Sequence, residues 1–176
     1  MRKWINIIVE QTAPDIMSNP AFRHWFGNSK VVDRLGHPLI VYHGTGHEFT
    51  AFDPESEPYT YEHDRGKFFF TTSREIAAEY AATGDSWGAV VHKNPRIIAA
   101  YISLQNPYVI DNSDDPINDW DQWGHLYAKD AETDGNDGII IHTEDASEWL
   151  VIAFRPEQIK EITNTKFDPN SPHMHE

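Results

Sequence analysis

From residue 31 onward, the chain alternates short apolar runs with turn residues, a pattern typical of β-strands. The runs follow one another closely, and the last of them ends at residue 162. The pattern predicts seven strands, which cover residues 38–43, 66–71, 89–92, 97–103, 138–142, 148–154 and 159–162.

Two segments between these strands show helical periodicity. One helix is predicted to begin at Thr72, where Thr-x-x-Glu forms a capping box with Glu75, and to end at Gly84. The other covers about residues 115–131, where large apolar side chains recur at helical spacing. A doubly wound parallel sheet needs a helix after nearly every strand, so the pattern favours an α+β fold of mostly antiparallel strands.

The two ends of the chain differ from this β-rich part. Residues 1–30 are predicted to form an N-terminal helical appendage, in which one short helix ends at Gly27. Residues 31–164 form the predicted core of a single domain. Residues 165–176 contain two prolines and are predicted to be a loosely ordered tail, and the acidic stretch 111–121 is predicted to be a surface loop.

Composition narrows the class of protein. The 176 residues suit one domain, and 39% hydrophobic and 12% aromatic residues supply enough apolar surface for a core. A formal charge of −14 disfavours broad nucleic-acid binding, which depends on Lys and Arg neutralising phosphates. The same charge would attract a basic protein partner.

The absence of certain residue types excludes further classes. The chain has no Cys, which removes disulfide scaffolds, thiolate nucleophiles and cysteine-based zinc sites, and no metal is expected. No run approaches the roughly 20 apolar residues that cross a bilayer, and the first residues lack a signal-peptide cleavage site. We therefore expect a soluble, cytoplasmic protein without a membrane partner.

Three separate clusters carry candidate chemistry. The first is Tyr42, His43, Gly44 and Thr45, where an apolar strand meets a glycine-rich turn that permits close approach of a ligand. Taken alone, this cluster is more often a polar turn with a hydrogen-bonded histidine. It therefore needs the support of other residues.

The second cluster joins the aromatic strand Phe69, Phe70 and Thr71 to the helix that carries Tyr80. A strand, a tight turn and two helical turns can bring Phe69 and Tyr80 to one slot for a planar ligand, although isolated aromatic pairs usually belong to the core. The third is Glu148, a carboxylate at the start of a strongly apolar run, which is either a solvated edge residue or a rigidly held catalytic group.

In this order, the three clusters resemble the ADP-ribosyltransferase superfamily of the His-Tyr-Glu type, which includes diphtheria toxin and the poly(ADP-ribose) polymerases. The stretches WFGNSKVVD (25–33), GHPLIVYHGT (36–45), PEQIK (156–160) and FDP (167–169) resemble the ADP-ribosyltransferase domains of phage and prophage polyvalent proteins. The other branch, with Arg, Ser-Thr-Ser and Glu-x-Glu, fits less well, since position 43 is His and position 146 is Ala.

The resemblance implies a split β-sandwich fold and NAD⁺ as co-substrate. It also assigns His43 to the adenine-side ribose, Gly44 to the nicotinamide carboxamide, Tyr80 to stacking on nicotinamide and Glu148 to the ribose 2′-hydroxyl. Tyr42, Thr45, Phe69, Phe70 and Thr71 are implied to line the same site. Phe69 stands where the polymerases carry a Tyr, and Ala77 where a Ser often helps bind the carboxamide.

The implied function is mono-ADP-ribosyl transfer to a macromolecule. The expected acceptor is a protein of the bacterial host, and the expected role is phage takeover of the host or defeat of its defences. Two alternatives stay open, namely an NAD⁺ glycohydrolase with water as acceptor and a catalytically silent acidic protein that covers a basic partner.

Overall fold

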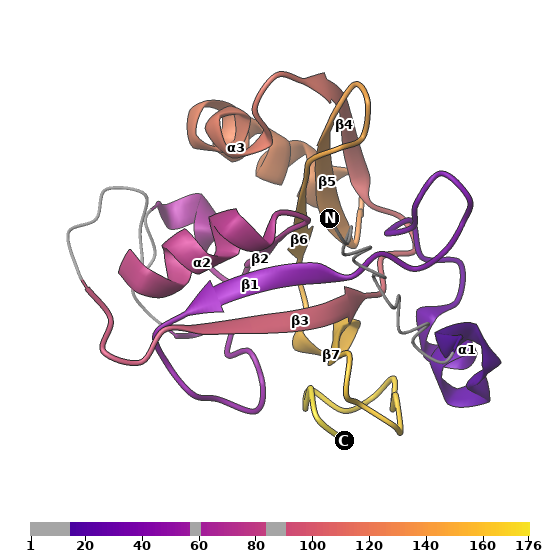
Figure 1. Ribbon diagram of the computed structural model, residues 1–176. Helices are drawn as coiled ribbons and strands as arrows, with labels where there is room; N and C mark the ends of the chain where they lie inside the picture. The colour runs from indigo at the N-terminus through magenta and orange to yellow at the C-terminus, as the bar shows by residue number, and fades with distance from the viewer. Residues whose placement is uncertain (1–14, 57–60, 84–90) are drawn as a thin grey trace, which may run out of the picture.

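The computed structural model describes residues 15–56, 61–83 and 91–176. Within these residues, seven strands form one mixed sheet in the order β4-β5-β6-β2-β1-β3-β7 (Figure 1). The strands are β1 (Val41–Thr45), β2 (Phe68–Thr71), β3 (Arg96–Ile102), β4 (Tyr108–Ser113), β5 (Gly138–Thr143), β6 (Trp149–Ala153) and β7 (Ile159–Glu161). The helices are α1 (Pro20–Phe26), α2 (Arg74–Thr83) and α3 (Pro116–Thr133), with 3₁₀ turns η1 (Ile16–Ser18), η2 (Glu62–Asp64) and η3 (Pro156–Gln158). The α+β prediction is confirmed.

The sheet is nearly divided between β1 and β2. These two strands share a single residue pair, Tyr42 with Thr71, whereas β1 pairs with β3 over five residues and β2 with β6 over four. In Figure 1, β1 and β3 run across the view while β4 and β5 stand upright. Because β1 and β2 share so little, the sheet forms two halves that meet at these strands. The named strands pair antiparallel except for β4 with β5.

Alternation of side chains along the strands builds a core on each face of the sheet. On β2, Phe70 belongs to a large cluster with Val41 and Val151, and loop residues such as Phe52 cover that face. On the opposite face, Phe69 belongs to a second cluster that α3 covers. Helix α2 packs on this second face as well, against β1. Both long helices therefore lie on one side of the sheet.

Helix α2 forms as predicted, but a different residue caps it. The Ser73 hydroxyl oxygen accepts from the backbone N–H of Ile76 at 3.3 Å, and this hydroxyl donates to Glu75 at 3.3 Å. The prediction that Thr72 is the cap was wrong, because the Thr72 hydroxyl accepts from the backbone N–H of Trp149 at 2.9 Å. Thr72 therefore ties the start of α2 to the start of β6.

Helix α3 confirms the second predicted helix. The Asp115 carboxylate caps this helix by accepting from the backbone N–H groups of Ile117 and Asn118, and Pro116 is its first residue. Its buried face carries Trp120 followed by the small residues Gly124 and Ala128. Trp123 is 47% exposed, so the apolar periodicity located the helix without identifying its buried face.

One strand was missed. The edge strand β4 occupies part of the stretch 111–121 that was predicted to be a surface loop, and α3 occupies another part. The strand was missed because half of β4 is exposed and carries polar residues, and because a register shift between Ile110 and Ser113 breaks the alternation of apolar and polar positions. Of the predicted strand 89–92, residues 89 and 90 lie outside the described residues, and residues 91 and 92 are not in a strand.

The C-terminal tail is packed, which contradicts the expected loose order. Phe167 and Met174 are buried, and the buried Lys160 donates to the backbone oxygens of Ser171 at 2.6 Å and His173 at 3.0 Å. The prolines and polar residues suggested disorder, but tertiary contacts with β7 stabilise the segment.

At the N-terminal end, helix α1 ends at Gly27 as predicted, with φ of 56°. Phe22 and Trp25 of this helix pack against Tyr101 of β3 and Phe167 of the tail. Residues 1–14 of the predicted appendage lie outside the described residues.

Candidate functional site

The three predicted clusters lie on or beside neighbouring strands at the centre of the sheet, except for Tyr80, which lies on α2. Their order is β6-β2-β1, with Glu148 directly before β6, Phe69 on β2 and His43 on β1. The register Tyr42–Thr71–Leu150 places Glu148 and His43 about three residues apart along the strands, roughly 10 Å. They are also two strand spacings apart, roughly 9.5 Å. The two positions therefore lie on either side of β2.

His43 is held between the two halves of the sheet. Its Nδ1 lies 2.8 Å from the backbone oxygen of Phe69, and its ring contacts Phe52 and Phe70 at centroid distances of 4.9 and 5.5 Å. Burial lowers the pKa of the imidazole below 6.5, while the bond to the Phe69 carbonyl oxygen partly opposes this. The neutral ring therefore donates from Nδ1, and Nε2 is left with a lone pair.

Gly44 allows α2 to approach β1 closely. A Cβ atom at this position would lie 1.9 Å from the Ala77 backbone oxygen and 2.6 Å from the Ala81 nitrogen. Gly44 therefore allows the short distance between β1 and α2, the helix that carries Tyr80. The expected contact between its backbone and a nicotinamide carboxamide stays a prediction.

The neighbours of His43 and Gly44 occupy different environments. Tyr42 lies beneath Arg74 of α2, with the guanidinium 5.8 Å from the ring centroid. Thr45 is buried, and its hydroxyl oxygen accepts from the backbone N–H of His47 at 3.1 Å. Tyr42 is thus the member of this pair that faces the helical side of the sheet.

The aromatic residues of the second cluster divide between the two faces. Phe70 and Thr71 are buried, and Phe70 belongs to the core on the side of His43. Phe69 is partly buried on the helical side, where its ring lies 5.4 Å from that of Trp120 in an edge arrangement. Tyr80 is partly buried near the C-terminal end of α2. The slot expected between Phe69 and Tyr80 stays a prediction.

Glu148 is held by its backbone at the start of β6. Its N–H donates to the Thr143 hydroxyl oxygen at 3.2 Å, and its carbonyl oxygen accepts from the Thr143 N–H at 3.1 Å. Burial, followed by the nearby Asp115 carboxylate, raises the pKa of the Glu148 carboxyl. Strand alternation and the nearby Asp115, the cap of α3, place this carboxyl on the helical side of the sheet. The His43 ring lies on the other side, beside Phe52 and Phe70, so the structure does not bring these two side chains together on one face.

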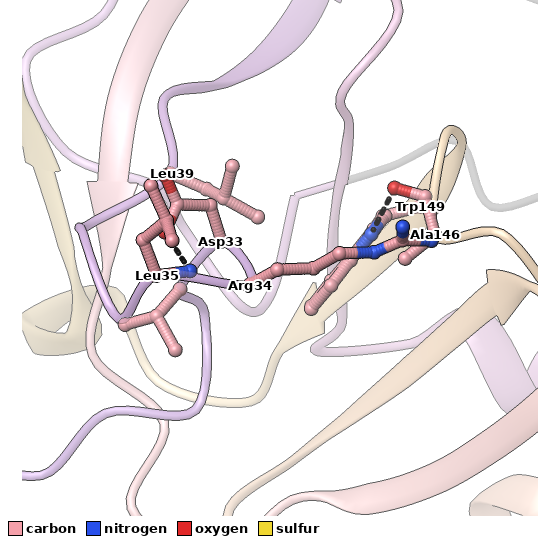
Figure 2. Close-up of a pocket in the computed structure, with 7 residues that line it drawn as sticks. Asp33, Arg34, Leu35, Leu39, Ala146 and Trp149 are labelled. Carbon is pink, nitrogen blue, oxygen red and sulfur yellow. Dashed lines mark hydrogen bonds between the residues drawn. The ribbon is translucent and has the colours of Figure 1, made fainter.

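Two open pockets lie beside this arrangement, on either side of Trp149. The larger, of about 450 Å³, lies between the turn at Asp33 and Arg34 and the turn at Ala146 (Figure 2). The second, of about 330 Å³, is lined by His142 and its neighbours on β4 and β5. Neither is lined by His43, Tyr80 or Glu148, so they do not mark the predicted nucleotide site.

Residues 15–56, 61–83 and 91–176 contain no group of three His, Cys, Asp or Glu side chains that could hold a metal ion. No helix within them combines the length and apolar character that crossing a bilayer requires.

The fold and the central strands define the class of an α+β domain of ADP-ribosyltransferase type. A family model of ADP-ribosyltransferase domains in polyvalent proteins matches residues 33–168, which is more than half of the chain. The chain belongs to this family, as its sequence motifs predicted. No curated protein and no solved structure matches it significantly.

The sequence interpretation missed the residues that hold Glu148. Thr72 and Thr143 bind the backbone on either side of β6, and Asp145 lies in the turn before it. A Thr-x-Asp-x-Ser pattern in a hairpin turn was the available signal, since such side chains often accept from nearby backbone N–H groups.

Proposed function

We propose that the protein is a mono-ADP-ribosyltransferase of the His-Tyr-Glu type. It would cleave NAD⁺ between nicotinamide and ribose and transfer ADP-ribose to a protein acceptor. The supporting observation is that one family match, residues 33–168, contains all three motif residues. ADP-ribosyl transfer is the activity for which the family is named.

Glu148 is the proposed catalytic residue. Cleavage of the nicotinamide bond develops positive charge on the ribose, as in other glycosidic cleavages. A fixed carboxylate beside the sugar stabilises that charge, and holding the 2′-hydroxyl adds orientation, together worth about 2–4 kcal/mol of barrier. The burial that raises the pKa of Glu148 also strengthens its attraction to a cation.

The remaining motif residues would bind the dinucleotide. His43 would accept from the adenine-side ribose through Nε2, because Nδ1 is bonded to Phe69. Tyr80 would stack on nicotinamide, and the Gly44 backbone would bind its carboxamide. Tyr42 and Phe69, which face the helical side, would add to the walls of the site, whereas Thr45, Phe70 and Thr71 are buried and would support it from within the sheet.

The acceptor is proposed to be a protein of a bacterial host, modified in its cytoplasm by a phage-encoded factor during takeover or against a defence system. The formal charge of −14 supports a basic target, because opposite charge speeds encounter. No metal is needed for this chemistry.

The test is transfer of label from NAD⁺ into a bacterial lysate. The wild type is expected to label one or a few proteins and to release nicotinamide, while Glu148→Gln lowers both by 100-fold or more. Glu144→Gln, an exposed carboxylate of the same hairpin, is the matched control and should keep wild-type activity.

Each other outcome decides between the alternatives. Equal labelling by wild type and Glu148→Gln would remove Glu148 from the mechanism. Free ADP-ribose without labelled protein would identify a glycohydrolase. Absence of NAD⁺ consumption, with a basic protein retained by both variants, would identify a silent binding protein.

A further inference from the structure

The turn that precedes Glu148 is organised by one carboxylate. Asp145 Oδ1 accepts from the Thr143 hydroxyl at 2.8 Å, from the Ser147 hydroxyl at 2.6 Å and from the Ser147 N–H at 3.0 Å. These bonds hold the pKa of Asp145 at about 2, far below its ordinary value. The group is therefore ionised at neutral pH.

The hydroxyl of Thr143 connects Asp145 to the backbone of Glu148. Because its proton points at Asp145 Oδ1, its lone pairs face the other way and accept from the N–H groups of Ser147 at 3.1 Å and Glu148 at 3.2 Å. The Thr143 backbone N–H also donates to the Glu148 carbonyl oxygen at 3.1 Å. Both backbone groups of Glu148 thus depend on one threonine, whose hydroxyl is oriented by Asp145.

The turn is also fixed from outside. Arg34 donates to the backbone oxygen of Asp145, and the Trp149 indole donates to the backbone oxygen of Ala146 at 3.2 Å. Ala146 has φ of 53°, a conformation that a residue with a side chain rarely adopts without such support.

We propose that Asp145 is a positioning residue for Glu148, acting through the Thr143 hydroxyl to hold the catalytic carboxylate in its reactive place. This inference rests on the proposed function. Asp145 is exposed and lies in a surface hairpin, so its removal should leave global stability almost unchanged and act on catalysis instead. A misplacement of about 1 Å at a catalytic group can cost about 100-fold in rate.

The first test compares NAD⁺ cleavage by full-length variants. Asp145→Ala should lower kcat at least tenfold while the KM for NAD⁺ stays within threefold and the urea midpoint is unchanged. Asp145→Asn should recover most of the loss, because its amide oxygen can still accept from Thr143 and Ser147. Asp168→Ala is the control, since Asp168 likewise accepts from a turn N–H, that of Asn170 at 2.9 Å.

A double variant separates positioning from a general structural effect. If Asp145 acts through Glu148, adding Asp145→Ala to Glu148→Gln causes no further loss of nicotinamide release. A further loss by the same factor as in the wild-type background would overturn the proposal.

A second measurement does not depend on activity. Hydrogen exchange at the Glu148 amide should be at least tenfold faster in Asp145→Ala than in wild type, while exchange at Ile140 in β5 is unchanged. Unchanged exchange at Glu148 would refute the positioning role whatever the kinetics. If exchange at Glu148 is faster in Asp145→Ala but the wild-type protein does not cleave NAD⁺, Asp145 positions Glu148 as proposed and the proposed function is wrong.

Discussion

Replacing Gly44 with alanine tests how closely α2 must lie on β1. The new Cβ atom would lie 1.9 Å from the Ala77 backbone oxygen and 2.6 Å from the Ala81 nitrogen. Both neighbours are backbone atoms in the middle of a helix, so no side chain can rotate away. The whole helix must move by about 1.5 Å to restore ordinary van der Waals contact.

The size of the effect follows from this displacement. Overpacking of a well-packed contact costs about 1–3 kcal/mol. Because the neighbours of Gly44 are rigid backbone atoms, Gly44→Ala should lower the free energy of unfolding by about 3 kcal/mol, the upper end of that range. Because α2 carries Tyr80, the shift should also lower NAD⁺ cleavage about 100-fold. The helix cannot relax without moving a proposed ligand contact.

Urea denaturation and nicotinamide release measure the two effects. Gly36→Ala is the control, since a Cβ there meets nothing within 4 Å and only its φ of +84° is unfavourable, by about 1 kcal/mol. A Gly44→Ala protein within 0.5 kcal/mol of wild type, with unchanged activity, would show that α2 does not press on β1 as described.

Two further predictions concern buried ionisable groups. Because burial lowers the folded-state pKa of His43 below 6.5, the unfolded state binds more protons as pH falls, so stability should decrease from pH 6.5 through that lowered pKa and then level off. The urea midpoint should fall less between pH 7.5 and 5 in His43→Gln than in wild type, and an equal fall would contradict the assignment. Lys160→Met leaves the backbone oxygens of Ser171 and His173 without their donor, which should cost about 2 kcal/mol and accelerate tryptic cleavage at Lys166. Unchanged cleavage would show that Lys160 does not anchor the tail.

Local patterns predicted much of the sheet, including the edge strand β7, but not the other edge strand, β4. The runs that became β2, β5 and β6 are strongly apolar because both faces of these strands are covered, and such runs are easy to recognise. Strand β4 escaped recognition because half of it faces solvent and a register shift breaks its alternation. The cap of α2 was misplaced by one residue because Thr72 and Ser73 are both good caps, and only the position of Trp149 decides between them.

The same limit applies to the candidate site. His43, Tyr80 and Glu148 were found by their resemblance to a family motif, since none of them is distinctive by itself. The network of Asp145 and Thr143 was missed, because Asp, Thr and Ser are ordinary residues in any hairpin turn. The proposed role of this network depends on Glu148, the residue that follows the turn.

The sequence by itself determined the α+β class, the central strands and the family, and it predicted the motif residues, because apolar periodicity and motif order are local properties of the chain. Only the tertiary structure decided that β2 lies between the strands of His43 and Glu148, that Gly44 meets a helix, and that the polar tail around Met174 is buried. The physical reason is that these features arise from contacts between residues distant in sequence, whose partners no local pattern specifies.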